Sequence, residues 1–91
     1  MAIITEKKID EILDYLQKSI DILGKESLEN LELEGGFDGV KEFLQNQFDV
    51  RLENLLTASN SNIHHLESGM KNKIIQRKQD IIKKISAQYR N

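Results

Sequence analysis

Five residues near the middle of the chain, Gly35-Gly36-Phe37-Asp38-Gly39, interrupt a sequence that has helical periodicity almost throughout. The paired glycines give the backbone the conformational freedom that a tight reversal needs. Aspartate at position 38 is a residue type that caps helix N-termini by accepting a hydrogen bond from a free backbone N–H. The phenylalanine before it can fold onto the first helical turn. The segment therefore predicts one helix, a sharp turn over 34–38, and a second helix that begins at Asp38–Gly39.

Before this turn, apolar residues recur at steps of three and four, which is typical of one face of a helix. They are Ile9, Ile12, Leu13, Leu16, Ile20 and Leu23, and Leu28 and Leu31 continue the stripe. Thr5 is placed to cap this helix, with Glu6 in its first turn. Gly24 either ends the helix as a C-terminal glycine or stands inside it as a small residue. Because the stripe continues past Gly24, the sequence favours one helix over 5–33.

After the turn, the apolar stripe resumes and keeps nearly one register to the end of the chain. Its members are Val40, Phe43, Leu44, Phe48, Leu52, Leu55, Leu56, Ile63, Leu66, Met70, Ile74, Ile81, Ile85 and Tyr89. This register predicts an all-α fold, an antiparallel helical hairpin with a long second helix, as a single domain over 1–91. Residues 57–62 oppose a continuous helix, because all but one are poor helix formers that prefer caps and turns. The alternative is a three-helix bundle broken near 59–62, with Ser61 or Asn62 capping the third helix.

The two arms of the expected hairpin differ in length. At 1.5 Å per residue, a helix over 40–89 would be roughly 75 Å long and one over 5–33 roughly 43 Å long. The C-terminal part of the stripe would then have no cover within the chain, and exposed apolar patches of this kind usually mark an interface. We therefore predict a partner-binding face for a helical protein or a second copy of this chain, formed by Ile74, Ile81, Ile85 and Tyr89.

The formal net charge of −2 hides an asymmetry between the two parts of the chain. Residues 1–56 hold 13 Asp and Glu against 6 Lys and Arg, whereas residues 57–91 hold 2 against 7. One interpretation is a basic surface for nucleic acid or anionic lipid. The other is that the acidic part packs against the basic part. The second is favoured, because a nucleic-acid binder usually has a basic domain overall.

The sequence also bears on location. No apolar run approaches the roughly 18–20 residues that span a membrane. The first residues lack the basic and apolar regions of a signal peptide. We therefore expect a chain made in the cytoplasm without stable membrane insertion, and any export to use a route that needs no cleaved signal.

Side chains that carry chemistry are few. The only histidines, His64 and His65, are adjacent, so on a helix they point about 100° apart and cannot share a metal. A zinc site needs three or four protein ligands, and the chain has no cysteine. The glycine turn is not followed by the Gly-Lys-Ser/Thr of a phosphate loop. We therefore expect no enzyme, no metal and no cofactor.

The aromatic-x-Gly spacing of Phe37 and Gly39, between two helical segments in a short cysteine-free chain, resembles the WxG-type small proteins of type VII (ESX-like) secretion. In that family Trp-x-Gly lies at the bend of a helical hairpin, and two hairpins pair into a four-helix bundle. Here phenylalanine takes the place of tryptophan. Family members or their partners often carry an export signal, an aromatic residue followed four residues later by Asp or Glu. Tyr89 has no such acid after it.

The resemblance implies a non-enzymatic helical partner protein in a Gram-positive bacterial setting. It would pair with a second WxG-like subunit or with a helical effector domain, such as that of an LXG-type toxin, whose subunit would carry the export signal. The alternative is a self-contained helical adaptor, regulator or immunity-type protein of bacteria that is not linked to secretion. In either case no nucleic-acid partner is expected.

Overall fold

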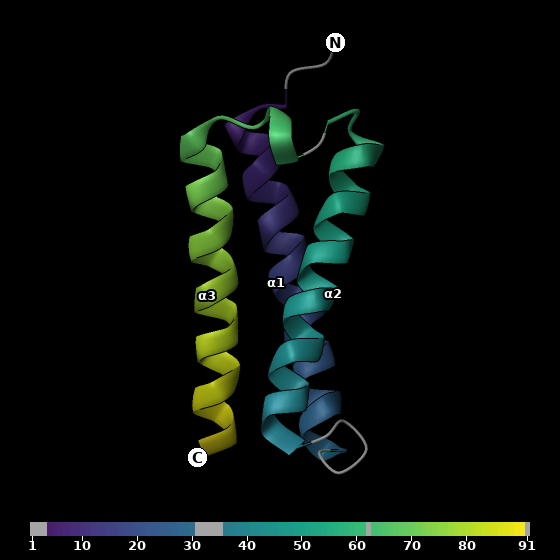
Figure 1. Ribbon diagram of the computed structural model, residues 1–91, viewed down its shortest axis with the longest axis vertical. Coiled ribbons are helices and arrows are strands. Elements are labelled where there is room, and N and C mark those ends of the chain that lie inside the picture. The colour runs from purple at the N-terminus through teal and green to yellow at the C-terminus, as the bar shows by residue number, and fades with distance from the viewer. Residues whose placement is uncertain (1–3, 31–35, 62, 91) are drawn as a thin grey trace.

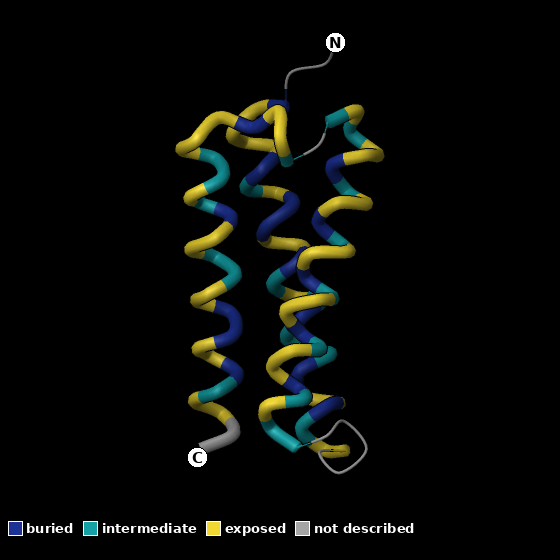
Figure 2. The backbone as a smooth tube through the Cα atoms, in the orientation of Figure 1, coloured by how far each residue is buried: buried dark blue, intermediate teal, exposed yellow. Residues whose placement is uncertain are grey.

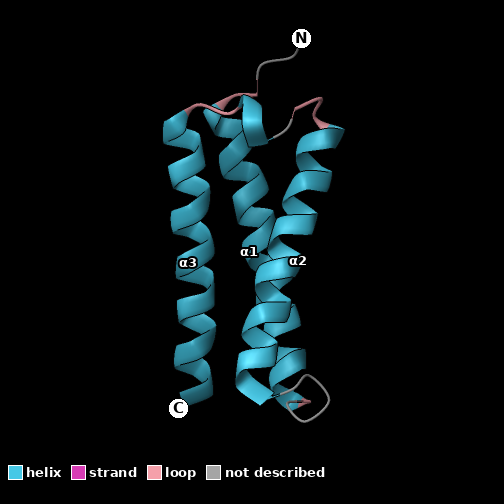
Figure 3. Cartoon of the chain, in the orientation of Figure 1, coloured by secondary structure: helices cyan, strands magenta, loops and turns pink. Residues whose placement is uncertain are grey.

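The computed structural model describes residues 4–30, 36–61 and 63–90, apart from the side chains of Tyr89 and Arg90. Three long helices follow one another: α1 (Glu6–Glu29), α2 (Gly36–Ala58) and α3 (Ser68–Arg90), with a short 3₁₀ helix η1 (Ile63–His65) before α3 (Figure 1). Helices and loops make up all the described ranges, which contain no strand (Figure 3). The all-α class is confirmed, and the expected two-helix hairpin is wrong.

Helix α1 begins as the sequence predicts. The Thr5 hydroxyl accepts a hydrogen bond from the backbone N–H of Lys8 at 3.1 Å, which satisfies one free donor of the first turn. The helix ends at Glu29, earlier than the predicted residue 33. Asn30 is the reason, because its side-chain amide donates to the Glu26 carbonyl at 3.0 Å and its backbone N–H to the Ser27 carbonyl at 3.1 Å.

The start of α2 differs from the prediction by two residues. The helix begins at Gly36, whose φ of +79° is a conformation that glycine adopts without strain. Phe37, Asp38 and Gly39 therefore lie in the first turn, and Asp38 does not cap the helix from outside. Its carboxylate still suits the positive end of the helix dipole. Phe37 is half-buried, while Gly35 lies outside the described residues.

The predicted continuous second helix is interrupted after Ala58. Asn60 has a φ of +58°, and the N–H groups of Asn60 and Ser61 donate to the carbonyls of Thr57 and Leu56 at 3.0 and 2.8 Å. These two hydrogen bonds, closed over a left-handed residue, are a Schellman cap. Asparagine tolerates the left-handed conformation better than other non-glycine residues, so the break occurs here.

The connection to α3 is longer than the alternative prediction allowed. The chain passes through η1, and α3 begins only at Ser68, so Ser61 does not cap it, and Asn62 lies outside the described residues. Leu66 is buried between η1 and α3 and fixes the connection on the end of the core.

The three helices form one bundle about 45 Å long, in which α1 and α3 run in the same direction and α2 runs in the opposite direction (Figure 1). Figure 2 shows the buried positions of each helix turned toward the other two. One core results, formed by Ile4, Ile9, Ile12, Leu13, Leu16, Ile20, Val40, Leu44, Phe48, Leu52, Leu56, Leu66, Ile74, Ile81, Ile82 and Ile85.

This core corrects the predicted partner-binding face. Ile74, Ile81 and Ile85 are only 3, 2 and 3 % exposed, because α1 and α2 cover the side of α3 that carries them. The C-terminal part of the stripe would lack cover only if the second helix were continuous. Because the chain breaks after Ala58, α3 folds back and packs against α1 and α2. The fourth residue of the predicted face, Tyr89, has its side chain outside the described part of the chain.

Charged side chains join the parallel helices α1 and α3 at their shared edge, as the packing of an acidic part against a basic part predicts. Lys73 pairs with Glu6 and Asp10, Arg77 with Asp14, and Lys84 with Asp21, at N–O distances of 3.1, 2.6, 2.9 and 3.7 Å. Exposed pairs contribute about 0–1 kcal/mol each, so the core supplies most of the stability. These ion pairs, which we call the ion-pair ladder, instead favour this alignment of α3 along α1.

Candidate protein-binding surface

The described residues hold no metal-binding cluster. His64 and His65 lie exposed in η1, and no three or more His, Cys, Asp or Glu side chains of the described ranges gather closely enough to hold a metal ion. No helix in the described part of the chain is both long and apolar enough to cross a membrane. Candidate functional features of the described residues lie on the outside of the bundle.

Four large apolar side chains are more than half exposed in the described residues: Tyr15 at 59 %, Ile22 at 60 %, Val50 at 52 % and Ile75 at 53 %. The first two lie on α1, Val50 on α2 and Ile75 on α3. Single exposed apolar residues are ordinary on protein surfaces. What distinguishes three of them here is their spacing on neighbouring helices.

On α1, Tyr15, Ser19 and Ile22 are spaced by four and three residues, which places them on one side of the helix. On α2, Phe43, Gln47 and Val50 repeat the same spacing. A hydrogen bond between Ser19 and Arg51 joins the two rows. We call this surface the α1–α2 face and define it by Tyr15, Ser19, Ile22, Phe43, Gln47, Val50 and Arg51.

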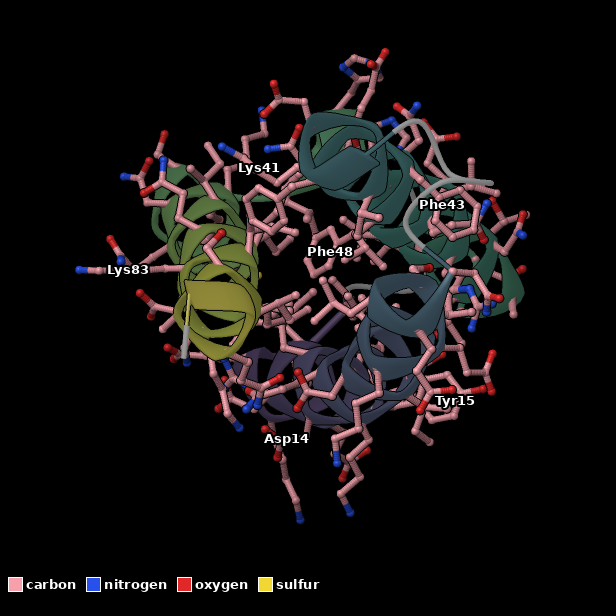
Figure 4. The ribbon with its side chains drawn as sticks, turned by 90° about the horizontal axis from the view of Figure 1, so that it is seen from below. Asp14, Tyr15, Lys41, Phe43, Phe48 and Lys83 are labelled. Atoms are coloured by element: carbon pink, nitrogen blue, oxygen red, sulfur yellow. The ribbon has the colours of Figure 1, made fainter. Side chains whose placement is uncertain are left out.

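The α1–α2 face lies on the side of the bundle away from α3. Figure 4 looks along the bundle and shows Tyr15 on α1 and Phe43 on α2 on the opposite side from α3. Phe43 is half-buried and packs against the edge of the core, so its ring joins the exposed surface to the interior. Phe48, one turn further along α2, points into the centre of the bundle instead (Figure 4).

Arg51 is the central charged group of the α1–α2 face. Its guanidinium donates to the Ser19 hydroxyl and to the Gln47 side-chain oxygen, the latter at 3.4 Å. Both partners are neutral, and the side chain is partly buried. Arg77, by contrast, pairs with the carboxylate of Asp14. A guanidinium held among neutral groups beside apolar side chains is suited to bind a carboxylate from another molecule.

Sequence reasoning did not find this surface. Tyr15 and Ile22 fall outside the core stripe of α1, among charged residues that indicate a solvated face. Their separation of seven residues was the available signal, because it places two apolar side chains on one side of a helix. Of the turn motif, Gly36, Phe37, Asp38 and Gly39 all lie in the first turn of α2, at the end of this hairpin.

No protein-family model, curated protein or solved structure matches this chain. The resemblance to WxG-type proteins therefore rests on Phe37, Gly39 and the α1–α2 hairpin.

Proposed function

We propose that this chain is a non-enzymatic helical partner protein that binds a helical segment of another protein along the α1–α2 face. The observation that carries the proposal is the pair of matching rows on α1 and α2, exposed and largely apolar, with Arg51 at their centre. Tyrosine, phenylalanine and arginine are the side chains that protein interfaces enrich.

The spacing of the face suits a helix. The row from Tyr15 to Ile22 covers about 11 Å at 1.5 Å per residue, within a helix α1 of 24 residues. A partner helix of about 20 residues laid between α1 and α2 would complete a four-helix arrangement, in which rows spaced by three and four residues interdigitate.

Apolar contact alone is a weak source of affinity here. The four apolar side chains of the face are already partly covered, and complete burial would contribute roughly 1 kcal/mol of binding free energy for each. They are Tyr15, Ile22, Phe43 and Val50. Association costs about 4 kcal/mol or more in lost freedom of motion. A carboxylate of the partner, placed on Arg51, would supply the charge-assisted hydrogen bonds that tip this balance. The partner helix is therefore expected to carry one acidic residue within an apolar stripe.

A more specific form of the proposal is that the partner belongs to a type VII secretion system. It would be a second WxG-like subunit or the helical domain of an LXG-type effector. Support comes from the packing of α1 against α2, with the aromatic-x-Gly residues Phe37 and Gly39 in the first turn of α2. In this form the chain is made in the cytoplasm and leaves the cell with its partner, without a cleaved signal.

The alternative is a self-contained helical adaptor, regulator or immunity-type protein that is not linked to secretion. The observation that favours it is the core, because three helices of one chain bury each other's apolar faces. The two forms differ in location. Detection of the chain in the culture medium only while type VII secretion is active supports the first, and retention in the cells supports the second.

The binding proposal is tested by isothermal titration calorimetry with the helical region of the protein encoded beside this gene. The double variant Ile22→Asp with Val50→Asp should weaken binding at least about tenfold, which corresponds to 1.4 kcal/mol. Arg51→Glu should weaken it similarly, because it replaces attraction for a carboxylate by repulsion. The matched control is Ile75→Asp, which changes an equally exposed isoleucine on α3 and should leave the affinity within about twofold.

Circular dichroism should report the same helix content for all three variants, since Ile22, Val50 and Ile75 are exposed and Arg51 lies outside the apolar core. Equal weakening by Ile75→Asp, or full affinity of the double variant, would show that binding does not use the α1–α2 face.

A further inference from the structure

A hollow lies between α2 and α3, on the side of the bundle turned away from α1 (Figure 4). Its volume is about 660 Å³, and we call it the α2–α3 groove, lined by Lys41, Gln45, Gln79, Ile82, Lys83, Ser86 and Ala87. Figure 4 shows Lys41 beside the gap between α2 and α3, and Lys83 extending from α3 to the solvent. The groove shares no residue with the α1–α2 face.

The spacing of the residues that line the groove is suited to the packing of a helix. On α3, Gln79, Ile82 and Ser86 are spaced by three and four residues, and the exposed Ile75 lies four residues before Gln79. This is the spacing that a packed helix meets on its neighbour. On α2, Lys41 and Gln45 form the opposite wall.

The floor of the groove permits close approach. Ser86 and Ala87 are small, and the Ser86 hydroxyl donates to the Ile82 carbonyl of its own helix at 2.9 Å. Because the Ser86 hydroxyl already has a hydrogen-bond partner, another helix can pack against it without leaving a buried polar group unpaired. Ile82 supplies apolar surface at the bottom.

The charges of the groove are of one sign. Both charged lining residues are lysines, one from each helix, and no carboxylate lines the groove. Four other cations of α3 are neutralised within the chain: Lys73, Arg77, Lys78 and Lys84. Lys41 and Lys83 have no ion-pair partner within the described ranges. Two lysines without an ion-pair partner in the described ranges therefore border the groove.

We propose that the α2–α3 groove is a second protein-binding site, which takes an acidic amphipathic helix of a partner protein. The bundle already contains a helix of this chemistry on its other side. Helix α1 buries an apolar stripe against α2 and α3 while its carboxylates pair with Lys73, Arg77 and Lys84. The groove offers the same combination, an apolar floor and two cationic walls. With the α1–α2 face, it would allow one chain to bridge two proteins.

Other anionic ligands fit the groove less well. Attraction of a membrane surface by electrostatics takes clusters of about 4–8 basic residues, and nucleic-acid binders are basic overall. The groove holds two lysines, and the chain has a net charge of −2. Short-range pairing inside a groove is therefore favoured over attraction to an extended polyanion.

The site is tested with a fluorescein-labelled designed helical peptide of about 20 residues, apolar along one stripe and carrying Glu beside it. A matched peptide carries Lys in place of every Glu. Fluorescence anisotropy should show binding of the Glu peptide, at least about tenfold tighter than the Lys peptide and weakened by added salt. Equal affinity for the two peptides, or no binding of either, would overturn the proposal.

Charge-reversal variants assign the binding to the groove. Lys41→Glu with Lys83→Glu should weaken the Glu peptide at least about tenfold. The control Lys18→Glu with Lys25→Glu makes the same charge change at exposed positions of α1 and should weaken it no more than about twofold. Equal weakening by both double variants would mean attraction by overall charge and would overturn the site.

Nuclear magnetic resonance keeps the test independent of any variant's folding. On addition of the Glu peptide, the amide signals of Gln45, Gln79 and Ser86 should shift, while those of Ser19 and Gln47 on the α1–α2 face should not. Shifts confined to the α1–α2 face would place the peptide in the site of the proposed function. Binding to vesicles of anionic phospholipid without binding of the peptide would replace the protein partner by a membrane surface.

Discussion

A β-carbon at Gly24 in α1 would lie 2.9 Å from Cδ1 and 3.2 Å from Cγ1 of Ile85 in α3. The first distance is shorter than real β-carbon contacts, so the glycine leaves room that the isoleucine fills. This contact joins the two parallel helices just after Lys84 and Asp21, which form the last ion pair between α1 and α3. It also explains why α1 runs through a glycine, which is a poor helix former.

We predict that Gly24→Ala destabilises the protein by about 1 kcal/mol. Alanine gains up to about 1 kcal/mol in helix propensity, but overpacking of a core costs roughly 1–3 kcal/mol. The β-branched Ile85 has few rotamers with which to relieve the contact. Urea denaturation followed by circular dichroism measures the change.

Two further variants separate packing from propensity. Gly69→Ala is the matched control, because a β-carbon there meets nothing within 4 Å, and it should stabilise by about 0.5 kcal/mol. In an Ile85→Val background, which lacks Cδ1, Gly24→Ala should cost less than in the wild type. An identical cost in both backgrounds would mean that the two residues are not coupled.

The break after α2 gives a prediction whose sign depends on the fold. Asn60 is left-handed in the cap, so Asn60→Ala should destabilise by about 1 kcal/mol and Asn60→Gly should be neutral or stabilising. In a continuous helix the order would reverse, because alanine is the best helix former and glycine one of the worst. Equilibrium unfolding of the two variants therefore distinguishes a three-helix bundle from a long hairpin.

The sequence predicts each helical segment of this chain but not how many helices there are. Leu56 and Ile63 are seven residues apart, which is two turns of a continuous helix, so the apolar stripe keeps its register across the break. A periodicity argument cannot detect an interruption that preserves the period. The Schellman cap depends on the left-handed conformation of one residue, Asn60. The polar residues around it are compatible with this conformation but do not require it.

The candidate surfaces are less visible in the sequence than the core. The rows of the α1–α2 face become neighbours only when α1 and α2 pack antiparallel. The hydrogen bond between Ser19 and Arg51 therefore depends on tertiary structure. The α2–α3 groove needs the third helix, which the favoured two-helix fold lacked. By contrast, the Thr5 cap and the pairing of the acidic and basic parts follow from short-range chemistry and charge count, and both are confirmed.

The same substitution should have very different effects on stability at two isoleucines of α3. Ile81 is buried in the core, and Ile81→Asp should cost about 4 kcal/mol or more, because an unpaired carboxylate replaces a packed side chain. A domain of this size has roughly 5–10 kcal/mol of stability in total, so the variant should be largely unfolded. Ile75→Asp, at an exposed position six residues earlier, should change stability by less than about 0.5 kcal/mol.

Circular dichroism and thermal melting of the two variants provide the comparison. A folded Ile81→Asp protein that merely loses an oligomer in light scattering would restore the earlier interpretation of this stripe as a partner-binding face.

The Lys73 ion pairs predict a difference in alkaline stability. The carboxylates of Asp10 and then Glu6 raise the pKa of the Lys73 ammonium above its ordinary value. A lysine whose pKa is higher in the folded state contributes its stabilisation fully at pH values below its unfolded pKa of about 10.4, and loses it as the pH rises through the folded value. Arginine at this position remains charged throughout, because the pKa of a guanidinium is well above that of an ammonium.

Urea denaturation at about pH 9.5 and about pH 11.5 should therefore show a larger loss of stability in the wild type than in Lys73→Arg. The two proteins are identical at every other position, so their difference isolates position 73. Lys7→Arg is the control, since Lys7 is exposed on the first turn of α1 and has no ion-pair partner within the described ranges. This control should lose as much stability as the wild type. If Lys73→Arg loses as much as well, the carboxylates of Asp10 and Glu6 do not hold the Lys73 charge in the folded protein.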